Sequence, residues 1–222
     1  MLKDFSNLKG NLDHKIFCIG FNKTATTSLN YFFKKNGLPS QHQAGRWDID
    51  KYQTFSDNGA RLMYKKLADK YKDAIFILQV RNLNKWIKSR GKHLEYSIWH
   101  KNRKEKIDPP SEELYKKWIL ERQNFHREVL EFFSNNKSRL LIVDIDSKNW
   151  IQRLAKELNL DPIIVKLNKI DDSKASPEFL QKIDDEFNLA CVSLLIPEKS
   201  RSESVLIPEL GNYDYSLFNS IL

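Results

Sequence analysis

Residues 15–37, KIFCIGFNKTATTSLNYFFKKNG, decide the fold that the sequence predicts. The apolar, β-prone residues 16–19 indicate a strand that ends at Gly20, and a short polar loop follows. From Thr26 the apolar residues recur at helical spacing, and Gly37 stands where a glycine ends a helix. The stretch therefore predicts a strand, a tight loop and an amphipathic helix.

The loop and the start of this helix have the composition of an anion site. A helix begins with backbone N–H groups that lack intrahelical partners, and this end carries a partial positive charge. The consecutive hydroxyl residues Thr26, Thr27 and Ser28 add hydrogen-bond donors, and Lys23 adds a full positive charge. An ordinary helix cap needs one hydroxyl, so the pattern favours a phosphate group as the ligand.

The composition of the 222-residue chain, 41% hydrophobic and 30% charged, is that of a globular protein. We expect a single domain over residues 1–222, with its core at about 15–165 and a C-terminal extension at 166–222. No run approaches the ~20 apolar residues that cross a bilayer, and the start lacks the apolar core of a signal peptide. Cys18 and Cys191 form neither a disulfide framework nor a zinc pattern, so we expect a cytoplasmic location.

The formal charge of +8 permits nucleic acid, a membrane surface or small anionic ligands as partners. The densest basic run, residues 100–106, is typical of a solvated loop. The chain has no known nucleic-acid-binding motif and no metal-ligand spacing. We therefore expect neither a nucleic-acid partner nor a metal.

A second strand–loop–helix unit is predicted over residues 74–90. Residues 74–80 are almost continuously apolar, as in a strand that is buried on both faces of a parallel sheet. Arg81 ends this strand, and Ser89 lies on the helix that follows. An arginine can bind a phosphate through two parallel hydrogen bonds, and a hydroxyl two turns along the helix can donate to the same group. The alternative is a surface ion pair for Arg81 and a solvent-facing Ser89.

The rest of the chain predicts more helices and one more strand. Apolar periodicity indicates helices at about residues 58–71, 111–135, 148–160 and 177–187, and a strand at 139–145. Residues 38–56 show no clean period and are predicted to form a long loop with short ordered pieces. In the helix at 58–71, the residues expected to face the core are Leu62, Met63, Leu67 and Ala68.

Two of these segments resemble motifs of the sulfotransferases that use 3′-phosphoadenosine 5′-phosphosulfate (PAPS). In NKTATTSL, residues 22–29, the lysine precedes the hydroxyls, as in the family's 5′-phosphosulfate loop; the order does not fit the ATP-binding loop GxxxxGK[ST]. RNLNKWIKS, residues 81–89, resembles the family's 3′-phosphate motif. The resemblance is to a bacterial branch and runs from about residue 15 to about 162. Ala25 departs from it, because the family usually has glycine there.

The resemblance implies an α/β fold, a P-loop-like three-layer arrangement whose mainly parallel sheet is flanked by helices. It also implies PAPS as the donor, 3′,5′-adenosine bisphosphate as the product, and no metal. The acceptor would be a small molecule or glycan with a hydroxyl or amine, and neither its identity nor the oligomeric state follows. The residues that would bind the donor are Asn22, Lys23, Thr24, Ala25, Thr26, Thr27, Ser28, Arg81 and Ser89, with Lys199 and Arg201 as further candidates.

For catalysis, Lys23 would neutralise the charge that develops on the 5′-phosphate. An acceptor hydroxyl also needs a general base. We favour Asp57, which matches an acidic position of the bacterial branch, although an aspartate there can equally cap the following helix. His42 titrates in the right range but can equally be an ordinary loop residue. Asp48 and Asp50 stay open as alternatives.

Two other functions compete with this interpretation. The first is an ATP-dependent P-loop kinase or phosphotransferase, for which Asp144 is the best available ligand for Mg²⁺. The second is a non-catalytic nucleotide- or nucleic-acid-binding protein. Ala25 keeps the non-catalytic alternative open, because a methyl group would narrow the loop.

Overall fold

The computed structural model describes residues 14–42, 49–101, 110–163 and 177–203. The chain divides into two compact units. The first unit comprises residues 1–80, 129–168 and 208–222, and the second comprises residues 81–128 and 169–207. The single domain that the sequence predicts over residues 1–222 stays a prediction.

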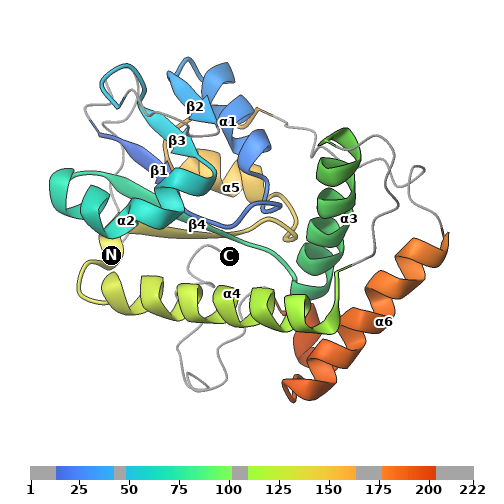
Figure 1. Ribbon diagram of the computed structural model, residues 1–222. Coiled ribbons are helices and arrows are strands. Elements are labelled where there is room, and N and C mark those ends of the chain that lie inside the picture. The colour runs from blue at the N-terminus through green and yellow to red at the C-terminus, as the bar shows by residue number, and fades with distance from the viewer. Residues whose placement is uncertain (1–13, 43–48, 102–109, 164–176, 204–222) are drawn as a thin grey trace. The chain divides into compact units, whose positions relative to one another are not determined.

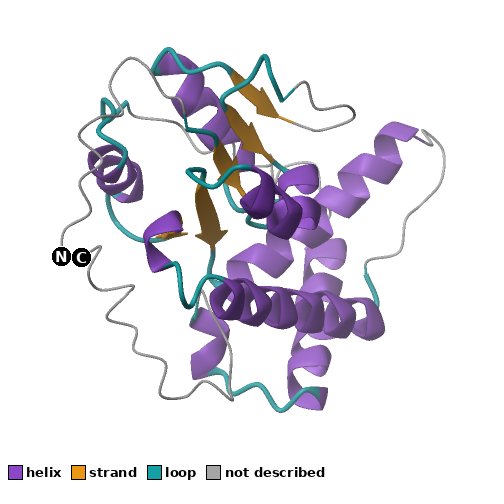
Figure 2. Ribbon diagram, turned by 90° about the vertical axis from the view of Figure 1, so that its left-hand side faces the viewer, coloured by secondary structure: helices purple, strands orange, loops and turns teal. Residues whose placement is uncertain are grey.

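A five-stranded sheet forms the centre of the first unit (Figures 1 and 2). Its strands lie in the order β2-β3-β1-β4-β5, and each neighbouring pair is parallel. The predicted α/β fold with a parallel sheet is therefore confirmed. The strands are β1 (Ile16–Cys18), β2 (Ser40–His42), β3 (Thr54–Ser56), β4 (Ile75–Val80) and β5 (Leu140–Asp144).

One face of this sheet packs against α1 (Thr26–Lys35) and α5 (Trp150–Glu157). The predicted apolar face of α1, formed by Leu29, Phe32 and Phe33, is 0% exposed in this core. Gly37 ends the helix as predicted, with φ 76°, and the next N–H, of Leu38, donates to the carbonyl oxygen of Phe33 at 3.0 Å. Glycine adopts this left-handed conformation without a steric penalty.

The opposite face of the sheet carries an aromatic core. Phe17 stacks on Phe55 and Phe76, with ring centres 5.2 Å and 5.4 Å away. Phe76 in turn contacts Phe133 at 5.1 Å, and Phe133 lies near Tyr64 of α2 (Asn58–Lys70). The aromatic contacts therefore link the central strands to α2 and to the chain segment after residue 129.

The predicted core face of α2 was partly wrong. Leu67 and Ala68 are buried, whereas Leu62 is 72% and Met63 45% exposed. Tyr64 sets the phase of the helix, because it packs into the aromatic core. The residues that α2 buries therefore recur at helical spacing as Ala60, Tyr64, Leu67 and Ala68.

The second unit is helical. It contains α3 (Leu83–Lys101), α4 (Glu112–Phe132), α6 (Pro177–Ser193) and the 3₁₀ turn η4 (Lys199–Ser202), while residues 129–132 of α4 belong to the first unit. The predicted helices at 111–135, 148–160 and 177–187 correspond to α4, α5 and α6, and the strand at 139–145 corresponds to β5 after the short turn η2 (Lys137–Arg139). None of the described helices is long and apolar enough to cross a membrane.

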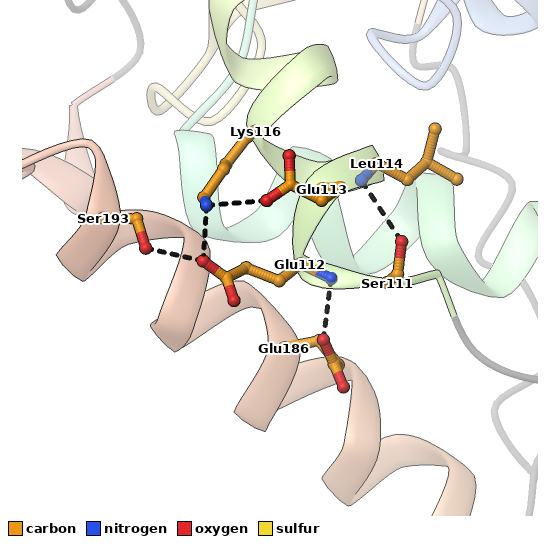
Figure 3. Close-up of polar contacts among 7 residues, drawn as sticks. All are labelled: Ser111, Glu112, Glu113, Leu114, Lys116, Glu186 and Ser193. Carbon is orange, nitrogen blue, oxygen red and sulfur yellow. Dashed lines mark hydrogen bonds and ion pairs between the residues drawn. The ribbon is translucent and has the colours of Figure 1, made fainter.

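The start of α4 is capped by other parts of the second unit (Figure 3). The backbone N–H of Glu112 donates to the carboxylate of Glu186 on α6 at 2.7 Å. The N–H of Leu114 points to the Ser111 hydroxyl at 3.4 Å. A carboxylate and a hydroxyl thus compensate the positive end of this helix, as helix caps commonly do.

Candidate functional site

The carboxyl end of β1 is the switch point of the sheet. From β1 the chain continues to β2 and β3 on one side, and then to β4 and β5 on the other side. Ligands of open parallel sheets bind outside the strand ends at such a point. The β1–α1 loop, residues 20–25, leaves the sheet here.

The β1–α1 loop has a constrained backbone. Lys23 and Ala25 have φ angles of 67° and 64°, a left-handed conformation that costs an L-residue about 1–2 kcal/mol. The Thr24 hydroxyl donates to the carbonyl oxygen of Phe21 at 2.5 Å and closes the loop on itself. Such strain at a ligand-binding edge is a feature of functional loops.

The start of α1 differs from the start of α4. Its N-cap residue is Ala25, its first turn contains no acidic residue, and no side chain of the described residues caps it. No acidic side chain of this first turn compensates the positive end of α1, and Lys23 adds a further charge beside it in sequence. An anion is the group that this helix end attracts.

The hydroxyls of this segment have different surroundings. Thr24, Thr26 and Ser28 are 3%, 6% and 4% exposed, and the Thr24 hydroxyl is used within the loop. Thr27 is exposed, whereas Asn22, Lys23 and Ala25 are partly exposed. Donor binding by these residues stays a prediction.

Two predicted base candidates lie together at the ends of β2 and β3. His42 is paired with Ser56 in the strand register, and its Nδ1 lies 3.1 Å from the Ser56 hydroxyl. Its other ring nitrogen, Nε2, lies 3.2 Å from the hydroxyl of Thr27 on α1. Asp57 follows Ser56 and interacts electrostatically with His42. The structure thus joins His42 and Asp57 to the first turn of α1.

Asp57 occupies the N-cap position of α2 with φ 78°, but its carboxylate makes no capping hydrogen bond in the described part of the chain. It is 8% exposed, and its buried Oδ1 accepts no hydrogen bond from the described residues. A helix cap therefore does not account for this aspartate.

Burial lowers the pKa of His42 below its usual value of 6.5. The Asp57 carboxylate opposes this effect and raises the pKa of His42, whereas the Lys34 ammonium acts with burial and lowers it. The balance keeps the imidazole neutral at neutral pH, so it can accept a proton.

The remaining acidic candidates lie elsewhere. Asp50 is exposed, and Asp48 lies outside the described residues. Asp144, the predicted Mg²⁺ ligand of a kinase, accepts a hydrogen bond from the N–H of Asp146 at 2.9 Å within a turn. In the part of the chain that the structure describes, no three His, Cys, Asp or Glu side chains are grouped as metal ligands.

The second predicted phosphate motif lies at the start of α3. The carbonyl oxygen of Arg81 accepts a hydrogen bond from Nη2 of Arg122 at 2.6 Å. Arg122 is 2% exposed, and its guanidinium lies 5.4 Å from the ring centre of Trp86. This buried arginine fixes the backbone at Arg81, while Ser89 lies two turns along α3 and is partly exposed.

The late basic turn η4 also contacts the start of α3. Nδ2 of Asn82 donates to the carbonyl oxygen of Ser202 at 2.7 Å, and the backbone N–H of Leu83 donates to the backbone carbonyl oxygen of Glu203 at 3.1 Å. Lys199 and Arg201 therefore lie on a turn whose end is hydrogen-bonded to Asn82 and Leu83, the two residues that follow Arg81. A polar cavity of about 300 Å³ is lined by Asn84, Lys88, Asp184, Phe187, Asn188, Glu198, Arg201 and Ser202.

Sequence reasoning missed three residues of these sites. Gln79 accepts a hydrogen bond from the Gly20 N–H at the start of the β1–α1 loop. The sequence could have indicated this residue, because Gln79 is the one polar residue of the apolar strand β4. Arg122 lies at helical spacing among the apolar residues of α4, which predicts that its side chain is buried. Ser56 ends a strand of three residues, too short to show a period.

A family model described as "Sulfotransferase domain" matches residues 34–159, more than half of the chain. The chain belongs to this sulfotransferase family. The matched part of the sulfotransferase contains His42, Asp57, Arg81 and Ser89, whereas the β1–α1 loop precedes it. A search of curated proteins finds no match. Membership of the family supports sulfuryl transfer as the general activity.

Proposed function

We propose that this sulfotransferase transfers the sulfuryl group of PAPS to a hydroxyl or amine of a small-molecule or glycan acceptor. The observation that carries the proposal is the start of α1. It follows a strained loop with Lys23 at the switch point of the sheet, and it has neither an acidic first turn nor a side-chain cap among the described residues. This end suits the 5′-phosphosulfate of the family's donor.

The donor's 3′-phosphate is assigned to Arg81 and Ser89 in the second unit. The hydrogen bond from Arg122 to the Arg81 carbonyl supports this assignment, because it fixes the backbone that carries the guanidinium. Lys199 and Arg201 add positive charge on the turn attached to Asn82. The carboxylates of Asp184 and Glu198 line the nearby cavity, so the cavity as a whole is not a simple anion site.

In the proposed reaction PAPS supplies the sulfuryl group. The acceptor oxygen attacks sulfur, the bond from sulfur to the bridging 5′-phosphate oxygen breaks, and its electron pair remains on the phosphate. Lys23 and the start of α1 stabilise that charge. His42, rather than the Asp57 that the sequence favoured as the base, takes the acceptor proton, and Asp57 stabilises the resulting imidazolium. The lowered pKa of His42, which keeps its ring neutral at neutral pH, supports this division of roles.

Binding is tested by thermal unfolding with 3′,5′-adenosine bisphosphate, and with ATP and Mg²⁺ in parallel. Ligand at about a hundred times its dissociation constant stabilises by ~2.7 kcal/mol, which is roughly 5–10 °C for a chain of this size. We expect this shift in the wild type and in the control Lys66→Ala, an exposed lysine of α2. The shift should be lost in Lys23→Ala and in Arg81→Ala. A shift with ATP and Mg²⁺ alone would instead favour a kinase.

Transfer is tested by the release of 3′,5′-adenosine bisphosphate from PAPS with phenolic, sugar and amine acceptors. Lys23→Ala should lower kcat about a hundredfold, the typical effect of losing a transition-state donor. Binding of the bisphosphate without release of product from any acceptor would support the non-catalytic alternative.

A further inference from the structure

We infer that Gln79 is a positioning residue that sets the orientation of the β1–α1 loop for the donor. This inference rests on the proposed function, since the loop is the proposed site of the 5′-phosphosulfate. No motif of the sequence includes Gln79, and its side chain belongs to the sheet rather than to the loop.

Gln79 is a polar residue in an apolar environment. All six residues of β4 are buried, and the other five are apolar. Gln79 is 0% exposed. By the alternation of side chains along a strand, it shares a face with Ile75 and Ile77, which belong to the core under α1 and α5. The amide therefore lies on the face of the sheet that supports α1.

The amide oxygen of Gln79 binds the first residue of the loop. The ladder between β1 and β4 is extended by the Ile19 N–H, which donates to the carbonyl oxygen of Ile77 at 2.8 Å. The next N–H, of Gly20, donates to Oε1 of Gln79 at 2.6 Å. A side chain thus supplies the acceptor at the point where the backbone leaves the sheet.

This contact continues into the strained part of the loop. A Cβ atom at Gly20 would lie 2.6 Å from Oε1 of Gln79 and 2.9 Å from the hydroxyl oxygen of Thr24. The Thr24 hydroxyl in turn donates to Phe21. The contacts of Gly20 with Gln79 and Thr24 thus connect β4 to the loop segment that contains Lys23.

Packing alone does not account for a glutamine here. Because the Gly20 N–H can only donate, the amide oxygen must face it and Nε2 must face away. Nε2 is buried and has no hydrogen-bond partner among the described residues. An unpartnered buried donor destabilises a fold, so an apolar residue of similar length would suit the core at least as well. The benefit of glutamine lies in its acceptor for the loop.

The test is Gln79→Met, which keeps the length and volume of the side chain but removes the acceptor. We expect the affinity for 3′,5′-adenosine bisphosphate, measured by calorimetric titration, to fall at least tenfold, because small errors in the position of a binding loop are costly. The melting temperature without ligand should stay within a few degrees, because an unpartnered Gly20 N–H replaces an unpartnered Nε2. If Gln79 had only a structural role, Gln79→Met would lower the melting temperature and leave the affinity for the bisphosphate unchanged.

Two further variants serve as controls. Ile77→Val perturbs the same face of the same strand, so it should lower stability without changing affinity. Gln79→Glu supplies an acceptor oxygen in either protonation state, and the uncharged form of its carboxyl, which burial favours, imitates the amide most closely. Its affinity should therefore recover at low pH and fall as the pH rises, when a carboxylate forms beneath the anion. Failure of Gln79→Glu to recover any affinity at low pH would overturn the inference.

Amide exchange separates a failure of this inference from a failure of the proposed function. In the protein without ligand, the Gly20 amide should exchange at least tenfold faster in Gln79→Met than in the wild type. If the wild type binds the bisphosphate and Gln79→Met binds it equally well, the inference is wrong. If the wild type does not bind it, the proposed function fails, and unchanged Gly20 exchange would then overturn the inference separately.

Discussion

The Thr27 hydroxyl, in the first turn of α1, lies 3.2 Å from Nε2 of His42 at the end of β2. Ser56 contacts the other ring nitrogen at 3.1 Å. Hydroxyls can donate or accept, so both contacts are compatible with a neutral imidazole. The proposed base is thereby tied to the helix whose start is the proposed donor site, and an acceptor that gives its proton to Nε2 must displace the contact with Thr27.

The pKa of His42 can be tested directly by proton NMR of its ring. Since burial lowers the pKa, we expect a midpoint below 6.5. Asp57→Asn should lower the midpoint further, because the carboxylate that favours the imidazolium is removed. Lys34→Gln should raise it, since a cation that disfavours the imidazolium is removed. Shifts of the same sign in the two variants would contradict this account.

Gly20→Ala should damage both stability and binding. The added Cβ would lie 2.5 Å from the backbone oxygen of Gln79, so we expect a loss of about 1–3 kcal/mol in the free energy of unfolding, with loss of bisphosphate binding. Gly37→Ala is the matched control: its Cβ meets nothing within 4 Å, but its φ is 76°. It should lower stability by about 1 kcal/mol and leave binding unchanged. Urea unfolding and calorimetric titration measure the two effects.

Ala25→Gly should stabilise the protein by about 0.5–1 kcal/mol, because glycine adopts the left-handed conformation of this residue at no steric cost. Asn149→Gly is the control at a second helix start with φ 59°. Asparagine tolerates this conformation, so urea unfolding should detect little change there. An Ala25→Gly variant that is less stable than the wild type would show that the methyl group packs favourably in the loop.

Acid should destabilise the second unit through His126. This side chain is 1% exposed, and burial, followed by the Arg122 charge, lowers its pKa well below 6.5. The unfolded chain therefore binds more protons than the folded chain below about pH 6.5, so the contribution to stability is complete above that pH and is lost as pH falls toward the folded pKa. His126→Gln should flatten this part of the urea-unfolding profile. An unchanged slope would contradict the assignment.

The long periodic elements of this fold were predictable from the sequence. The strand at 74–80, the helix with Leu29, Phe32 and Phe33, and the glycine that ends it all have local signals that agree with their tertiary contacts. Residues 38–56 were predicted as a long loop with short ordered pieces, and the structure has the three-residue strands β2 and β3 there. Three residues are too few to show alternation, and these strands are specified by pairing with β1 and with each other.

The candidate site was predictable in its residue types but not in its connections. Lys23, His42 and Asp57 follow from residue chemistry and the family motif. The contacts of His42 with Thr27 and Ser56 depend on the strand register, which no local pattern encodes. The exposed Leu62 and Met63 show the same dependence, because the aromatic partners of Tyr64 decide the phase of α2.

Strand β1 has only three residues, yet it lies at the centre of the sheet and pairs Ile16 with both Thr54 and Ile75. Its partners are distant in sequence, so β1 joins the sheet only after long segments of chain have closed, which is a slow event in folding. The β1–α1 loop depends on that pairing, because its first N–H is held by Gln79 of β4. During refolding, the rate at which bisphosphate binding recovers would therefore report the rate at which β1 pairs with β3 and β4. We expect this rate to be lower than the rate at which the helical circular dichroism signal recovers.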